Sequence, residues 1–176
     1  MLSSLFGQKS FLDPDIEAWH LETWRILLDR FADELPITET PVALPTRDFF
    51  PPTEATGHAR AEHVFACVKS IMGMSEDWPC ALEMQPRRMT GQQVSEFVTI
   101  AGDNDPNGTF RVEPDGAVII TYAPDLLDDP TGLVATLAHE LSHYLLAGQG
   151  DLVEDETHEL MTDLMVAFTG LGVFGA

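Results

Sequence analysis

Basic residues are scarce in this chain of 176 residues, which has nine Lys and Arg against 29 Asp and Glu and a net charge of −20. Nucleic-acid phosphates and anionic lipid headgroups both need clustered cations, so the composition argues against either as a partner. Cysteine is also rare: the two residues form no CxxC pair, which argues against a disulfide framework and a cysteine-ligated zinc ribbon. No apolar stretch approaches the length needed to span a membrane.

The remaining composition is typical of a globular protein, with 44% hydrophobic and 22% charged residues. The N-terminus lacks a basic segment followed by an unbroken apolar stretch, so the sequence predicts no secretory signal. We therefore expect a cytoplasmic location with reduced thiols.

The length fits a single domain, with a helical part over residues 1–75, a sheet over 78–123 and a helix pair over 129–170. Apolar residues at three- and four-residue spacing predict four helices, over residues 14–31, 54–72, 130–147 and 151–168. β-prone stretches predict strands over residues 80–84, 97–100, 109–112 and 117–122. Pro114-Asp115-Gly116 forms a hairpin turn between the last two strands, so we expect an α+β fold with a small, mainly antiparallel sheet.

The last two predicted helices each carry an apolar face that should be buried. In the helix over 130–147 this face consists of Leu133, Val134, Leu137, Leu141 and Leu145. In the helix over 151–168 it consists of Leu160, Met161, Leu164, Met165 and Phe168.

The helix over 130–147 contains an HExxH motif, His139-Glu140-Leu141-Ser142-His143. Residues four apart return to nearly the same face of an α-helix, so both imidazoles point one way and can hold one metal ion. Glu140 projects beside them, where its carboxylate can take a proton from a metal-bound water. The motif predicts a hydrolytic metal site; the alternative is a solvated polar helix face.

A zinc site needs a third ligand, and the last predicted helix offers one. Glu159 and Asp163 are four residues apart and share one face of that helix. Two helices joined by a short turn lie antiparallel, which brings Glu159 against the two histidines. Glu159 would leave a fourth position open for water, as in catalytic zinc sites, and Asp163 could accept a hydrogen bond from a ligating imidazole. Glu156 and His158 remain alternative third ligands.

HExxH followed by ExxxD on the next helix resembles the gluzincin, or thermolysin-type, branch of the zincin metallopeptidases, over roughly residues 117–168. The resemblance implies a zincin-like domain with one Zn²⁺ per chain, Glu140 as the general base and Asp163 as partner of a ligating histidine. The zinc ligands it implies are His139, His143 and Glu159. It also implies a peptidase whose peptide or protein substrate lies along the edge strand before the motif helix, formed by Val118, Ile119, Ile120, Thr121 and Tyr122.

The chain departs from the gluzincin pattern after Asp163, where that family usually places a His or Tyr that stabilises the oxyanion. No His, Tyr, Lys or Arg follows Asp163; candidate substitutes elsewhere are Tyr122, Tyr144 and His158. This difference favours an alternative function, a metal-bearing interaction module that binds a partner segment at its edge strand without turnover. Two imidazoles and a carboxylate also suit manganese, cobalt or nickel.

The chain ends in an apolar, glycine-rich stretch over residues 168–176. Such an end is typical of an interior segment. We therefore expect either that a C-terminal part is missing or that the tail is buried at an interface, as it would be in an oligomer.

Overall fold

The computed structural model describes residues 12–31, 33, 40–74, 78–86, 106–148, 150 and 157–175. These residues form four α-helices and a three-stranded sheet in an α+β arrangement. Two helices come first, α1 (Pro14–Phe31) and α2 (Gly57–Ile71), followed by the strands β1 (Cys80–Met84), β2 (Gly108–Val112) and β3 (Val118–Tyr122). The 3-10 helix η1 (Pro124–Asp128), the helices α3 (Pro130–Gly148) and α4 (His158–Phe168) and the 3-10 helix η2 (Gly172–Gly175) complete the chain order.

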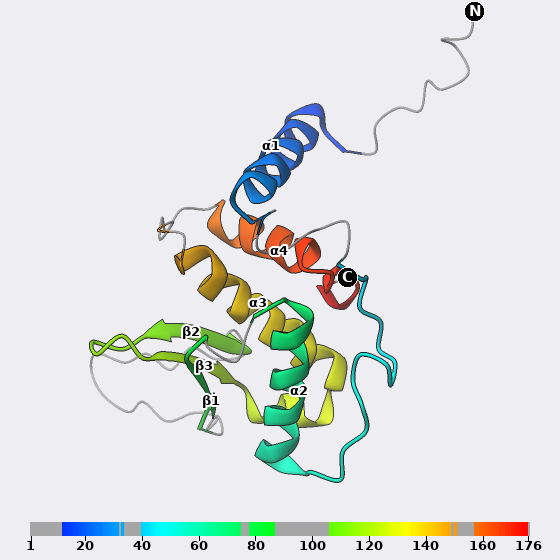
Figure 1. Ribbon diagram of the computed structural model, residues 1–176, viewed down its shortest axis with the longest axis vertical. Coiled ribbons are helices and arrows are strands. Elements are labelled where there is room, and N and C mark those ends of the chain that lie inside the picture. The colour runs from blue at the N-terminus through cyan, green and yellow to red at the C-terminus, as the bar shows by residue number, and fades with distance from the viewer. Residues whose placement is uncertain are drawn as a thin grey trace, which may run out of the picture.

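Helix α3 lies at the centre of the molecule. It packs against the sheet, α2 and α4, and α4 in turn packs against α1. Figure 1 shows the sheet and α4 on opposite sides of α3, with α1 beyond α4. The predicted apolar face of α3 is confirmed, because all five of its residues are buried: Leu133, Val134, Leu137, Leu141 and Leu145.

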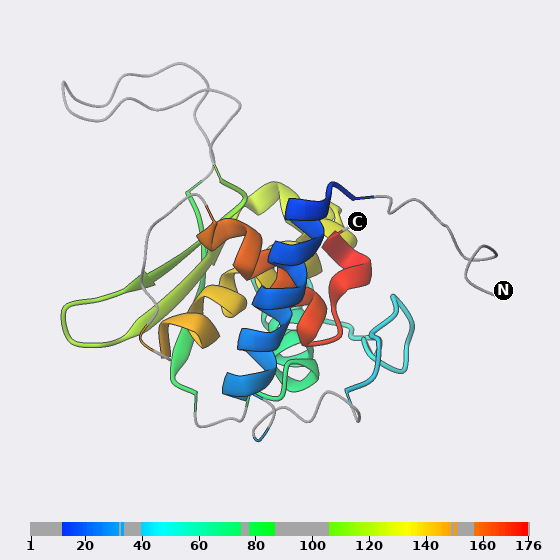
Figure 2. The same ribbon diagram turned by 90° about the horizontal axis from the view of Figure 1, so that it is seen from above.

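The sheet is mixed, with the strand order β1-β3-β2. β2 and β3 form the predicted antiparallel hairpin, and Gly116 adopts a φ of 86° in its turn, which favours glycine. β1 pairs with β3 in parallel, so the prediction of a mainly antiparallel sheet is wrong. The turn signal fixes only the local β2–β3 pairing, and the partner of β1 depends on distant contacts. The predicted strand over 97–100 lies outside the described residues. The turn of the hairpin projects beyond the helices in Figures 1 and 2.

Helices α1 and α3 begin and end close to their predicted bounds. The Asp129 carboxylate caps α3 by accepting a hydrogen bond from the Gly132 N–H at 3.0 Å. α2 begins at Gly57 instead of residue 54, and α4 begins at His158 instead of residue 151. Thr56 and Thr157 precede these helices, and neither side chain forms a capping hydrogen bond. Residues 151–156 lie outside the described part of the chain.

The apolar face of α4 is rotated from its predicted position. Met165 and Phe168 are buried as expected, but Leu160 is 53% exposed. Glu159 turns towards the histidines of α3, and the next residue of a helix points about 100° away, so Leu160 faces solvent. Thr162 takes a buried place on the inner side of α4 that the sequence had assigned to apolar residues.

The segment after α4 returns to the core of the same chain. Leu171 and Phe174 are buried, and the Phe174 ring packs edge-on against Phe50 with 5.5 Å between centroids. The Ala43 N–H donates to the Gly170 carbonyl at 2.8 Å, which ties the segment before α2 to the end of α4. Within the described residues, none of the helices combines the length and the apolar character needed to cross a membrane.

Candidate metal centre

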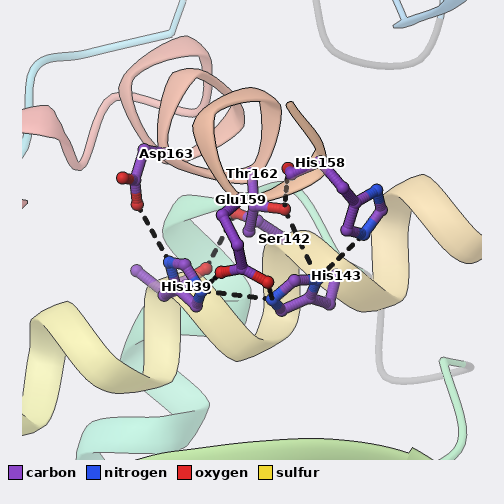
Figure 3. Close-up of polar contacts among 8 residues, drawn as sticks. His139, Ser142, His143, His158, Glu159, Thr162 and Asp163 are labelled. Atoms are coloured by element: carbon purple, nitrogen blue, oxygen red, sulfur yellow. Dashed lines mark hydrogen bonds and ion pairs between the residues drawn. The ribbon is translucent and has the colours of Figure 1, made fainter. Parts of the chain in front are cut away.

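Three donor groups converge where α3 and α4 face each other. Nε2 of His139 lies 3.1 Å from Nε2 of His143 and 3.1 Å from Oε2 of Glu159 (Figure 3). Nε2 of His143 lies 3.7 Å from Oε1 of Glu159. Among the described residues, these three form the one group of His, Cys, Asp or Glu close enough to share an ion, and Glu159 is exposed while both imidazoles are half-buried.

The chemistry of these three donors fits a tetrahedral zinc ion. Zinc bonds to imidazole nitrogen and carboxylate oxygen are about 2.0–2.1 Å long, so tetrahedral ligand atoms lie about 3.3–3.4 Å apart. The two imidazole nitrogens are 3.1 Å apart, but their contacts with Glu159, at 3.1 and 3.7 Å, are made to different oxygens of its carboxylate. With one ligand atom taken from each residue, the three atoms lie within 4.8 Å of one another. The donor set therefore suits zinc in its chemistry, with ligand atoms close to the separations that the ion requires.

Asp163 fixes the orientation of His139. Its Oδ1 lies 2.9 Å from Nδ1 of His139 and accepts a hydrogen bond from that nitrogen (Figure 3). With the proton on Nδ1, the lone pair of His139 is on Nε2, the atom that faces His143 and Glu159. Asp163, the hydrogen-bond acceptor predicted for a ligating histidine, thus lies at hydrogen-bonding distance from one of them.

The other side of His143 faces two residues of α4. Nδ1 of His143 lies 3.2 Å from Nε2 of His158 and 3.4 Å from the Thr162 hydroxyl. The Thr162 hydroxyl donates to the His158 carbonyl at 2.9 Å, within the first turn of α4. On the face of the ring, Phe110 of β2 lies nearly parallel to His143 with 6.3 Å between centroids.

Glu140 lies on the side of α3 that faces β2 and is only 7% exposed. Burial raises its pKa from 4.5 to about 7; the nearby Glu159 adds to this rise, and His139 and the Phe110 N–H oppose it. The Phe110 N–H forms a hydrogen bond to the carboxylate. A carboxyl group with a pKa near neutrality can both take up and release a proton at physiological pH, as a general base and acid must.

A cavity of about 430 Å³ opens beside His139, one of the three donors. His139, Glu140 and Asp163 line one side of it. Asn107 and Gly108 of the β2 end and residues of α3, α4 and η2 form the remaining walls. A molecule in this cavity would contact the Glu140 carboxyl group and, of the three donors, His139.

Gly108 allows β2 to approach α3 closely at this point. A Cβ atom on Gly108 would lie 2.5 Å from Cγ2 of Thr136 and 3.0 Å from Cγ of Glu140. Real Cβ atoms do not approach other atoms this closely, so only glycine fits without displacing the helix or the strand.

The prediction that residues 118–122 form the edge strand is wrong. Residues 118–122 form β3, which is hydrogen-bonded on both sides and lies at the centre of the sheet. Within the described residues β2 is the edge strand beside the cavity. The Ala123 N–H donates a hydrogen bond to the Asn107 carbonyl, and the Glu113 N–H donates one to the Ala117 carbonyl. The odd-numbered residues of this segment therefore pair with β3, and the backbone groups of the even-numbered residues of β2 point away from it.

The three candidate oxyanion stabilisers have their polar groups engaged elsewhere. The Tyr122 hydroxyl lies 2.9 Å from Nδ1 of His58, and the ring of Tyr122 is fully buried. The Tyr144 hydroxyl donates to the Pro79 carbonyl at 3.4 Å. His158 lies behind His143, at its Nδ1, and outside the group of three donors (Figure 3). Glu156, the alternative third ligand, lies outside the described residues.

Three residues near the centre had no role in the sequence interpretation: Gly108, Phe110 and Thr162. Thr162 could have been found, because it lies between Glu159 and Asp163 and four residues after His158. Gly108 and Phe110 could not, since their roles depend on how β2 docks against α3.

Comparison of the chain with protein-family models, curated proteins and solved structures gave no match. The interpretation of the site therefore depends on its residues and their geometry.

Proposed function

We propose that the protein is a zinc-dependent hydrolase with a zincin-like site, and that its substrates are peptides or proteins. One observation carries the proposal: two imidazole nitrogens and the Glu159 carboxylate converge within 4.8 Å of one another, next to a buried carboxyl group. The choice of peptide bonds rests on the resemblance of HExxH and ExxxD to the gluzincin pattern.

In this proposal His139, His143 and Glu159 hold the ion, and Asp163 keeps the lone pair of His139 directed at it. When bound, zinc would lower the pKa of a coordinated water towards about 7 and polarise the carbonyl of the substrate. The Glu140 carboxylate accepts the proton of the attacking water and then donates it to the amide nitrogen that leaves. The Phe110 N–H keeps this carboxylate directed towards the cavity.

The edge of β2 that faces away from β3 offers a way to align an extended substrate. Gly108, Phe110 and Val112 occupy the positions whose backbone groups point away from β3. The Phe110 N–H is bonded to Glu140, so the substrate would use the other backbone groups of this edge. An extended peptide could add to this edge as a further strand and lie beside the cavity. β2 therefore replaces residues 118–122 as the strand that we expect to bind substrate.

The experiment that tests the proposal compares zinc content and peptide cleavage in matched variants. Protein prepared without metal-affinity resin should contain one zinc per chain, and His143→Ala should lose it because one ligand is removed. Glu140→Gln should keep its zinc and lose cleavage, because the amide cannot accept the proton. His20→Ala, which removes a histidine that bonds only within α1, is the control and should change neither. Cleavage that survives Glu140→Gln would contradict the general-base role.

A second function is favoured by one specific observation. Tyr122 and Tyr144 have their hydroxyls engaged elsewhere, and His158 contacts Nδ1 of His143, so none of the three is directed at the open side of the ion. A metal-bearing interaction module that binds a partner segment at the edge of β2 needs no such group. It would retain one divalent ion per chain, bind peptides and leave them uncleaved in a library screen.

A further inference from the structure

His143 must direct its Nε2 lone pair at the ion, which requires a proton on Nδ1 and an acceptor for that proton. Its nearest polar neighbour at Nδ1 is Nε2 of His158, at 3.2 Å. The two rings are inclined by 25°, with 5.2 Å between centroids. The contact between the two nitrogens meets the distance of a hydrogen bond, with one ring donating and the other accepting.

The Thr162 hydroxyl is a weaker partner for the same nitrogen. It lies 3.4 Å from Nδ1 of His143, and its proton is already directed at the His158 carbonyl, 2.9 Å away. Thr162 is fully buried, so this bond fixes the first turn of α4, from which His158 projects. Thr162 thus supports the position of His158, and the shorter contact to Nδ1 belongs to His158.

We propose that His158 is a positioning residue: its Nε2 accepts the Nδ1–H of His143 and thereby holds the Nε2 lone pair of His143 on the metal. This inference rests on the proposed zinc site. It excludes the two roles expected for His158 from the sequence, because a nitrogen that accepts this bond is available neither as a third ligand nor to the oxyanion. His158 itself then carries its proton on Nδ1.

The two ligating histidines would consequently have different partners. His139 has the Asp163 carboxylate, whose oxygens can each accept a hydrogen bond, at 2.9 Å. His143 has an imidazole, which accepts only through the one ring nitrogen that carries no proton. The tautomer of His158 therefore fixes the tautomer of His143.

The test measures the zinc dissociation constant by competition with a chromophoric chelator. His158→Leu removes the acceptor at similar volume and should raise the dissociation constant about 10–100-fold. His158→Gln should restore most of the affinity, because its Oε1 can accept the same proton. His20→Leu is the control and should leave the constant unchanged.

The outcomes separate this inference from the proposed function. Wild-type protein that takes up no zinc would overturn both. If His158→Leu binds zinc as tightly as the wild type does, only the role of His158 is overturned. The same holds if His158→Gln binds zinc as weakly as His158→Leu. If His158→Leu does not fold, nitrogen-15 spectra of the zinc-loaded wild type decide. A proton on Nδ1 of both His143 and His158 is expected, and a proton on Nε2 of His158 would refute the proposal.

Discussion

Replacing the buried glutamate of α3 should stabilise the metal-free protein at alkaline pH and leave it nearly unchanged at acid pH. Burial raises the pKa of Glu140 from 4.5 to about 7. Because this pKa is higher in the folded chain, the contribution of Glu140 to stability is fully present below pH 4.5 and is lost as the pH rises through about 7. At about 1.4 kcal/mol for each tenfold change, the full difference corresponds to about 3 kcal/mol.

Glu140→Gln keeps the shape and the acceptor for the Phe110 N–H but removes the ionisable group. Relative to wild type, its free energy of unfolding should therefore rise by about 2–3 kcal/mol between about pH 5 and about pH 8.5. For a chain of this size this corresponds to about 5–10 °C in the unfolding temperature. Urea and thermal unfolding with a chelator present would measure it.

The control is Glu54→Gln, which removes the same charge at an exposed position. In a chain with a net charge of −20, loss of any acidic group relieves some repulsion, and this control reports that general effect. An equal gain for both variants, or a Glu140→Gln gain independent of pH, would refute the burial argument. A confirmed gain would mean that Glu140, the residue proposed to transfer the proton, lowers the stability of the fold at the pH at which the reaction takes place.

Three further outcomes are expected. Gly108→Ala should lower the free energy of unfolding by about 1–3 kcal/mol in denaturant titrations, because its Cβ would overlap Thr136 and Glu140; an unchanged midpoint would contradict this close approach. Saturating zinc, at about a thousand times its dissociation constant, should stabilise the wild type by about 4 kcal/mol, and Glu159→Ala should show little of this effect in thermal melts; full stabilisation of that variant would remove Glu159 from the ligands. Gly170→Ala should cost at least about 1–2 kcal/mol of unfolding free energy, because φ is 88° there and the new Cβ would meet the Pro41 carbonyl; Gly175→Ala, with open space around it, is the control.

The features that the sequence predicted well are those determined by neighbouring residues. The bounds of α3 follow from Asp129 before it and from the spacing of its apolar face, and HExxH spacing places His139 and His143 on one side of that helix. The distance of Glu159 and Asp163 from these histidines also agrees with the expectation that two consecutive helices lie side by side. All of these inferences use only helical periodicity and a short connection.

The features that the sequence missed depend on contacts between distant segments. The strand over 118–122 was expected at an edge because it precedes the motif helix, yet β1, nearly forty residues earlier, pairs with its free side. Its apolar alternation is the same in a central as in an edge strand, so no local signal distinguishes the two. The contact of Phe110 with Glu140 requires knowing which strand docks on α3, and the exposure of Leu160 follows from the rotation that brings Glu159 to the histidines.

Helix α4 carries the third donor and both outer partners of the histidines within a single short element. A rotation of this helix would move Glu159, Asp163 and His158 away from α3 together, so the ligand set should be gained or lost as one unit. The opposite side of α4 is held by α1, where Trp24 and Phe31 pack against Phe168 with ring centroids 5.5 and 6.3 Å apart. Metal affinity should therefore depend on a helix that supplies no ligand and lies more than a hundred residues earlier in the chain.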